Sequence, residues 1–123
     1  MTEPEKFSIQ KRIKSFRYAF EGIGKFLVSE HNARLHLTAT ILVLTVSLLL
    51  KISQSEMIAV VGMVGLVWVT EMFNTCVEKI MDCISQEKRS DIEFIKDVAA
   101  GAVLIASLAA FVTALIIFIP KFL

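Results

Sequence analysis

The sequence lacks the glycine-rich loops with which many soluble enzymes hold phosphate groups. Those loops work because successive backbone N–H groups cradle a phosphate. Neither a Walker loop nor a G-x-G-x-x-G motif occurs here, and the five glycines are scattered along the chain, at Gly22, Gly24, Gly62, Gly65 and Gly101. If this protein handles a nucleotide, its site must differ from those of soluble nucleotide-binding enzymes.

Cysteine and histidine are scarce, with two of each. Cys76 and Cys83 are separated by about 10 Å of rise on one predicted helix, which is too far for a disulfide. They also lack a metal-thiolate spacing, so we interpret both as small apolar fillers. His31 and His36 are not at a convincing metal-ligand spacing, and we interpret them as structural or interfacial.

An excess of charge is missing as well, since the net charge is only +1 and does not suggest a nucleic-acid partner. In contrast, 55% of the 123 residues are hydrophobic, and the mean hydropathy is +0.68. This composition leaves too little polar chain to cover a water-facing surface. We therefore predict an all-α integral membrane protein, and the length allows a single domain spanning residues 1–123.

A cleavable signal peptide is not expected. The amino-terminal part is polar or amphipathic through residue 34, and the first long apolar run starts near Leu35. A signal peptide places its apolar core much earlier. We expect the membrane segments to remain in the mature protein.

Residues 8–28 show the periodicity of an amphipathic helix. The apolar residues recur at intervals of three and four: Ile13, Phe16, Phe20, Ile23 and Leu27. The other positions carry Lys11, Arg12, Lys14, Arg17 and Lys25, against Glu21. An apolar stripe with a basic opposite face favours a helix in the lipid headgroup region, and an ordinary helix packed on a protein partner is the alternative.

Three apolar segments follow, over residues 33–52, 57–84 and 98–119. Each approaches or exceeds the roughly 20 residues that cross the hydrocarbon of a bilayer. A polar turn separates the first two, and residues 85–95 read as a solvated connection. We expect Pro120 to end the third segment.

The basic residues predict how these segments are oriented. They are Lys6, Lys11, Arg12, Lys14, Arg17 and Lys25 before the first segment, Lys51 after it, Lys88, Arg89 and Lys96 between the second and third, and Lys121 in the tail. Basic loops stay in the cytoplasm. The amino terminus and the 85–97 loop are therefore predicted to be cytoplasmic, and the carboxyl terminus to be outside.

The third segment carries a ridge of small residues at intervals of four: Ala102, Ala106, Ala110 and Ala114. Such a ridge allows another helix to approach closely. Because three helices are few for enclosing a polar site, we expect a homo-oligomer.

The second segment changes from apolar to polar along its length. Glu71, Asn74, Glu78 and Asp82 fall within about 80° of one another on a helix. Counting from Met57, Glu71 lies about 21 Å into a core about 30 Å thick. A carboxylate at that depth is costly and usually marks a functional site, although an interhelical polar clamp is the alternative. For Asp82 a simpler interpretation is that its side chain lies on the solvated surface.

Two further groups of polar residues are predicted near the same membrane face. They are Glu30, His31, Asn32 and Arg34 before the first segment, and Lys96 with Asp97 before the third. Carboxylates from separate helices can hold Mg²⁺ together with substrate phosphates, and the basic residues suit phosphate. The pattern fits phosphoryl transfer at the bilayer face, with Glu71 placed to take a proton from a lipid hydroxyl.

Four stretches resemble the motifs of the small prokaryotic diacylglycerol kinase family, in order and at the right separations. Residues 71–82, Glu-Met-Phe-Asn-Thr-Cys-Val-Glu-Lys-Ile-Met-Asp, resemble E-x-x-N-[ST]-x-x-E-x-x-x-D. Residues 96–104, Lys-Asp-Val-Ala-Ala-Gly-Ala-Val-Leu, resemble K-D-x-x-[AS]-[AG]-A-V-L. Residues 29–34, Ser-Glu-His-Asn-Ala-Arg, and 18–22, Tyr-Ala-Phe-Glu-Gly, resemble its amino-terminal signatures. The resemblance covers roughly residues 11–119.

This resemblance implies a homotrimer in the bacterial inner membrane, with active sites shared between subunits, that transfers the γ-phosphate of ATP to a lipid alcohol with Mg²⁺. It implies that Glu71 is the proton acceptor and that Glu30 and Glu78 are metal ligands. Arg34 and Glu71 are assigned to substrate binding. The implied nucleotide-binding residues are Lys11, Tyr18, Asn74, Glu87, Lys88, Arg89, Lys96 and Asp97.

Two features depart from the family pattern. Lys11 stands where some relatives have Arg, so the planar fork for phosphate is lost while the charge is kept. The loop lacks the Tyr-His pair common there. Members of the family use either diacylglycerol or undecaprenol, and the phrases around residues 30–36 and 96–104 lean toward the undecaprenol branch.

Two other functions fit parts of the sequence. A small proton-coupled transporter also uses a membrane carboxylate, but its site belongs at the midplane, whereas this polar face gathers at one side. A non-catalytic membrane assembly subunit would use the polar face as glue and would bind neither ATP nor Mg²⁺.

Overall fold

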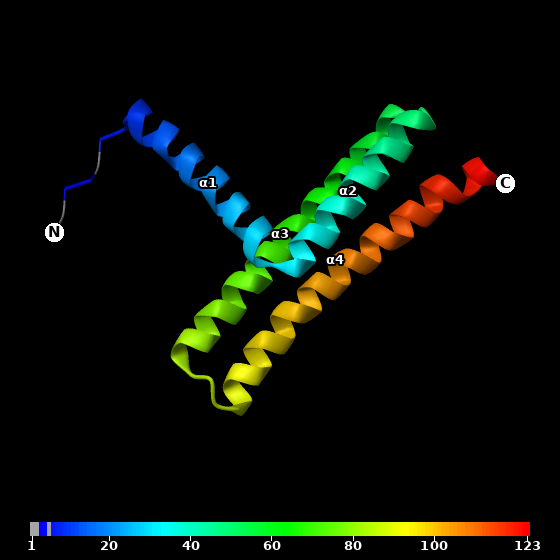
Figure 1. Cartoon of the computed structure of the whole chain (residues 1–123). Coiled ribbons are helices and arrows are strands. Elements are labelled where there is room, and N and C mark those ends of the chain that lie inside the picture. The colour runs from blue at the N-terminus through cyan, green and yellow to red at the C-terminus, as the bar shows by residue number, and fades with distance from the viewer. Residues whose placement is uncertain (1–2, 5) are drawn as a thin grey trace. The chain divides into compact units, whose positions relative to one another are not determined.

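The computed structural model describes residues 3, 4 and 6–123, and their regular secondary structure consists of four α-helices (Figure 1). These are α1 (Ile9–Ser29), α2 (His31–Leu49), α3 (Gln54–Ile84) and α4 (Ser90–Phe122). Backbone contacts divide the chain into two compact units, Met1–Leu35 and His36–Leu123. By length and composition, α2, α3 and α4 are each able to cross a membrane. The predictions of an all-α chain and of three long apolar helices are confirmed.

Helix α1 matches the helix predicted over residues 8–28. It begins after Ser8, whose hydroxyl accepts a bond from the Lys11 N–H at 3.5 Å, and it ends where the Glu30 N–H donates to the Phe26 carbonyl. Most of its apolar side chains are exposed, Phe16 at 69% and Phe20 at 72%, whereas Phe26 is buried. The location of this helix at the membrane surface stays a prediction.

The turn between α2 and α3 is a Schellman motif. The Ile52 N–H donates to the Ser47 carbonyl at 3.3 Å and the Lys51 N–H to the Leu48 carbonyl at 3.2 Å. Lys51 has φ 51°, the left-handed conformation that glycine adopts without cost. The chain therefore reverses direction here with a lysine in a position that favours glycine.

Helix α3 begins with a capping box. The Ser53 hydroxyl accepts from the Glu56 N–H at 3.2 Å, and the Ser53 N–H donates to the Glu56 carboxylate at 2.9 Å. Two orphan N–H groups of the first turn are satisfied in this way. The same carboxylate lies 2.9 Å from the Lys121 ammonium, near the end of α4.

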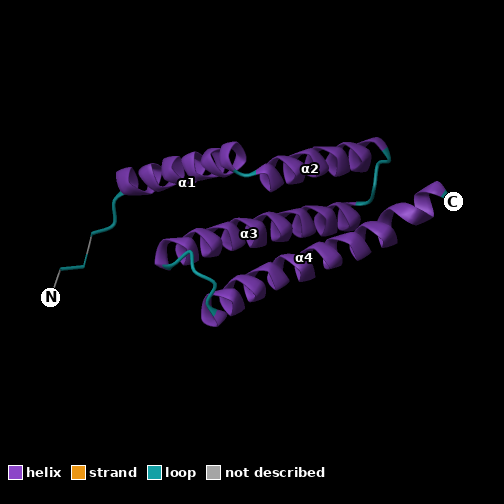
Figure 2. Ribbon diagram, turned by 60° about the horizontal axis from the view of Figure 1, so that its bottom comes forward, coloured by secondary structure: helices purple, strands orange, loops and turns teal. Residues whose placement is uncertain are grey.

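Helices α3 and α4 pack side by side as an antiparallel hairpin (Figures 1 and 2). Ion pairs mark its two ends, Lys121 with Glu56 at one and Lys96 with Asp82 at 2.7 Å at the other. Ala106, from the predicted small-residue ridge, is only 3% exposed. A small side chain at this position allows the two backbones to approach closely.

Two predicted boundaries of the third apolar segment are wrong. Helix α4 starts at Ser90, so residues 90–95 of the predicted connection 85–95 are helical. Asp91 and Glu93 in its first turn complement the helix dipole, and Ile92 is buried. Pro120 does not end the helix, which continues to Phe122. A proline removes its own backbone bond, but the residues after it keep their N–H donors and continue the helix.

Candidate active site

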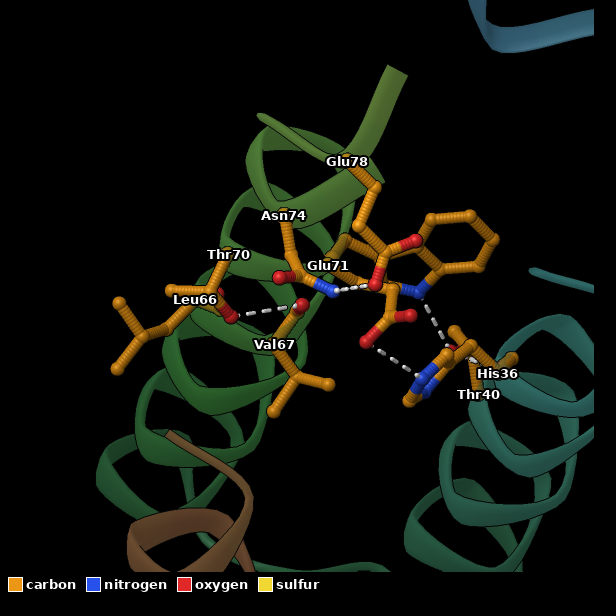
Figure 3. A network of polar contacts seen from close by, with 9 residues as sticks. His36, Thr40, Leu66, Val67, Thr70, Glu71, Asn74 and Glu78 are labelled. Carbon is orange, nitrogen blue, oxygen red and sulfur yellow. Dashed lines mark hydrogen bonds and ion pairs between the residues drawn. The ribbon is translucent and has the colours of Figure 1, made fainter. Parts of the chain in front are cut away.

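Glu71 is a buried carboxylate in the second half of α3. Its exposure is 7%. The side chain of His36, on α2, faces it across the helix pair, with Nε2 at 3.5 Å from Glu71 Oε2 (Figure 3). A carboxylate in the apolar part of a membrane helix is costly and needs such a polar neighbour.

One turn further along α3, Asn74 and Glu78 continue the polar face. Asn74 Nδ2 donates to Glu78 Oε1 at 3.2 Å, and Figure 3 shows both side chains on the same side of the helix as Glu71. The Asn74 Oδ1 is buried and has no hydrogen-bond partner among the described residues. A buried acceptor without a donor is suited to accept a hydrogen bond from a bound molecule.

A second contact joins α2 and α3 next to the first. Trp68 Nε1 donates to Thr40 Oγ1 at 2.8 Å, and the Thr40 hydroxyl donates to the His36 carbonyl at 2.7 Å. The His36 and Trp68 rings lie 6.4 Å apart with a tilt of 56°. Two neighbouring polar contacts therefore fix the register of α2 against α3.

An apolar cavity of about 320 Å³ lies between α2, α3 and α4. Its walls run from His36, Trp68 and Ser107 at one end to Val60 and Phe118 at the other. Along α3 this is roughly 12 Å of helix. Glu71 follows Trp68 by one turn, so the carboxylate lies next to the end of the cavity that His36 lines.

The other predicted residues of the second unit lie near the α3–α4 connection. The Lys96 ammonium is paired with Asp82, and the Arg89 guanidinium holds the Asp91 carboxylate through Nε at 3.2 Å and Nη2 at 2.7 Å. Glu87 and Lys88 are exposed in the connection, and Asp97 is exposed on α4. The structure thus joins Lys96 to α3 and ties Arg89 to the start of its own helix.

The remaining predicted residues belong to the first unit. Lys11 and Tyr18 line one hollow near the start of α1, together with Arg12 and Lys14. Glu30 is half-buried in the break between α1 and α2, and Arg34 is exposed in the first turn of α2. The hollow gathers positive charge around an aromatic ring, which suits a phosphate-bearing ligand.

The described part of the chain has no group of three or more His, Cys, Asp or Glu side chains that could hold a metal ion by itself. Glu78 keeps a carboxylate oxygen beyond the one bonded to Asn74. Mg²⁺ binds through one or two carboxylates while substrate phosphates and waters fill its other positions. The donor set therefore fits a Mg²⁺ ion that arrives with a nucleotide.

His36, interpreted from the sequence as structural or interfacial, contacts Glu71 in the structure. The sequence does contain a clue to this contact, because the first two apolar segments are joined by a short turn near Lys51 and must run antiparallel. Folding the chain back at that turn brings residue 36 opposite the stretch that contains Trp68 and Glu71. Side-chain direction, which periodicity alone does not give for two facing helices, decides that the imidazole points at the carboxylate.

Comparison with known proteins identifies relatives over nearly the whole chain. The family model "Prokaryotic diacylglycerol kinase" matches residues 17–118. The undecaprenol kinase of Bacillus subtilis is 30% identical over 113 residues, which cover 92% of each chain. The diacylglycerol kinase of Synechocystis sp. is 32% identical over 111 residues, which cover 89% of this chain and 63% of that one.

Proposed function

Because the chain belongs to the prokaryotic diacylglycerol kinase family, we propose that it transfers the γ-phosphate of ATP to the primary hydroxyl of a membrane lipid alcohol. It is a multi-pass membrane protein and a lipid kinase. The observation that carries the proposal is the buried Glu71 carboxylate beside one end of an apolar cavity. A reaction between a lipid hydroxyl and a water-soluble nucleotide needs a base at such a boundary.

In the proposed reaction Glu71 accepts the proton of the lipid hydroxyl. The hydroxyl oxygen forms a bond to the γ-phosphorus, the bond from that phosphorus to the bridging oxygen breaks, and ADP leaves. A positioned general base contributes typically 10²- to 10⁴-fold to such a step. Positioning and charge stabilisation supply most of the rest in phosphoryl transfer.

Glu78 and Glu30 would hold Mg²⁺, which would supply positive charge next to the phosphates. Lys11, Tyr18, Arg34 and the loop residues contribute to substrate and nucleotide binding as the resemblance implies. Lys96 enters this role from an ion pair with Asp82, so binding a phosphate requires the ammonium to share or exchange its partner. Arg89 likewise starts from its pair with Asp91.

For the acceptor we favour undecaprenol over diacylglycerol. The relative that this chain matches over 92% of both lengths is an undecaprenol kinase. The hydrocarbon next to the hydroxyl would lie in the cavity between α2, α3 and α4, whose lining is mostly aliphatic and aromatic. Burying apolar chain there contributes about 0.8 kcal/mol per CH₂ group.

The proposed assembly is a homotrimer in the bacterial inner membrane, with the amino terminus in the cytoplasm and the carboxyl terminus outside. The orientation follows the basic residues. It places Glu71, Glu78 and Lys96 toward the cytoplasm, where ATP is available. The Lys121–Glu56 pair then marks the outer end of the hairpin.

The test is phosphate transfer from labelled ATP by purified protein in mixed micelles. Dioleoylglycerol and undecaprenol are offered separately, each with and without Mg²⁺. We expect Mg²⁺-dependent label in lipid, faster with undecaprenol. No label in either lipid, from protein shown to be folded and oligomeric, would overturn the proposal, and proton flux in liposomes would then test the transporter hypothesis.

A further inference from the structure

The proposed reaction gives His36 no role, although its side chain contacts Glu71. This contact joins two groups that are costly to bury, and the exposed fractions of the two side chains are 27% and 9%. A histidine that only filled space between two membrane helices would not need to direct a ring nitrogen at a carboxylate. The direction of the His36 ring toward Glu71 therefore indicates a chemical role for the contact.

The position of the imidazole is itself controlled. Thr40, one turn along α2, donates to the His36 carbonyl and accepts from Trp68, which precedes Glu71 by one turn on α3. The contacts at residues 36 and 71 and at residues 40 and 68 lie on successive turns of an antiparallel pair. The Trp68 ring, 6.4 Å away, further restricts the His36 ring.

His36 also lines the cavity, at the end nearest Glu71. Its ring consequently lies where the buried carboxylate and the apolar space meet. A lipid hydroxyl presented to Glu71 from that space passes close to the imidazole. The ring is well placed to determine which way the carboxylate faces.

We propose that His36 is a positioning residue for Glu71, an inference that rests on the proposed lipid kinase activity. The Nε2–H of His36 donates to Oε2 of Glu71, at a distance that shortens when substrate is bound. This fixes the plane of the carboxylate and leaves Oε1 for the hydroxyl proton. During the reaction the proton moves from the lipid oxygen to Oε1, and His36 keeps its own.

The physical reason is geometric. A glutamate side chain has three rotatable bonds, so an unheld carboxylate samples orientations in which neither oxygen faces the hydroxyl. Misplacement of a reacting group by about 1 Å can lower a rate by about 10²-fold. A donor fixed on the opposite helix removes that freedom before the substrate arrives.

The test compares variants at position 36 in the micelle assay with labelled ATP and undecaprenol, and with dioleoylglycerol in parallel. His36→Ala and His36→Leu remove the donor, and Leu fills the space if the Ala variant does not assemble. His36→Gln restores an N–H donor. We expect kcat to fall about 10²-fold in the first two, with an unchanged KM for MgATP, and to recover to within about tenfold of wild type in His36→Gln.

A matched structural control is Ile117→Ala, which opens a void at a buried position distant along the hairpin from Glu71. It should lower the thermal unfolding midpoint while leaving kcat near that of wild type. The inference is overturned if His36→Leu keeps the wild-type kcat, if His36→Gln recovers no more than His36→Leu, or if Ile117→Ala loses as much kcat as His36→Leu. If the wild-type protein labels neither lipid, the proposed function itself has failed, and the two failures are distinguished.

Discussion

Helix α3 meets its two neighbours in different ways. Toward α4 the contact is extensive and includes the buried Ala106, and ion pairs lie at both ends, at Glu56 and Asp82. Toward α2 the contact is made by side chains, His36 with Glu71 and Thr40 with Trp68, beside a cavity of about 320 Å³. The α3–α4 hairpin thus has the features of a scaffold, and the α2 side has those of a site.

The two contacts of α3 differ in whether they leave space for a substrate next to a polar group. The tight contact around Ala106 joins α3 and α4, whereas the space bounded by α2, α3 and α4 lies beside a buried carboxylate and its partner. The ion pairs at the ends of the α3–α4 hairpin are partly exposed, and such pairs stabilise a fold only modestly. The polar groups between α2 and α3 include Glu71, the proposed base, and its neighbour His36.

The largest effect is expected from Glu71→Gln, which removes the base and keeps the size of the side chain. We expect kcat to fall about 10³-fold, because a general base contributes 10²- to 10⁴-fold. The measurement is label transfer to lipid, with the oligomeric state checked by size-exclusion chromatography. Glu93→Gln is the matched control, an exposed carboxylate on α4 that should leave activity unchanged. Full activity in Glu71→Gln would remove Glu71 from the role of base.

A smaller effect is expected from filling the cavity with Ala110→Phe. Because about two CH₂ groups of the lipid would then no longer be buried, the KM for the lipid substrate should rise about tenfold. The KM for MgATP should not change, since the cavity is apolar. The control is Ala102→Phe, on the same ridge of α4 but exposed and outside the cavity. An equal rise in the lipid KM for both variants would show that the cavity does not hold the lipid chain.

The smallest effect concerns the turn that joins the looser pair of helices. Lys51→Gly relieves the left-handed backbone at φ 51° and should raise the free energy of unfolding by about 1 kcal/mol. Thermal unfolding in micelles measures this. Lys51→Ala is the control, because it removes the charge and keeps the Cβ. A midpoint that rises equally in both variants would assign the gain to the charge instead.

Much of the fold follows from local patterns in the sequence. Long apolar runs predict α2, α3 and α4, since only helices satisfy the backbone within hydrocarbon. The boundaries of α4 were the exception. Its first turn carries Asp91 and Glu93 around a buried Ile92. Because this turn is polar, its composition predicts a loop rather than the start of a helix. Pro120 predicts the end of the helix, but α4 continues for two residues beyond it.

Helical periodicity is sufficient to predict that Glu71, Asn74 and Glu78 share one helix, and the family motifs can be read in order along the chain. The packing of the helices is needed to establish that His36 faces Glu71, that Lys96 is paired with Asp82, and that a cavity lies between α2, α3 and α4. Periodicity reports the faces of one helix, because the rise and turn per residue are fixed. The partner of each face depends on how two helices are rotated against each other, which packing across the whole bundle sets.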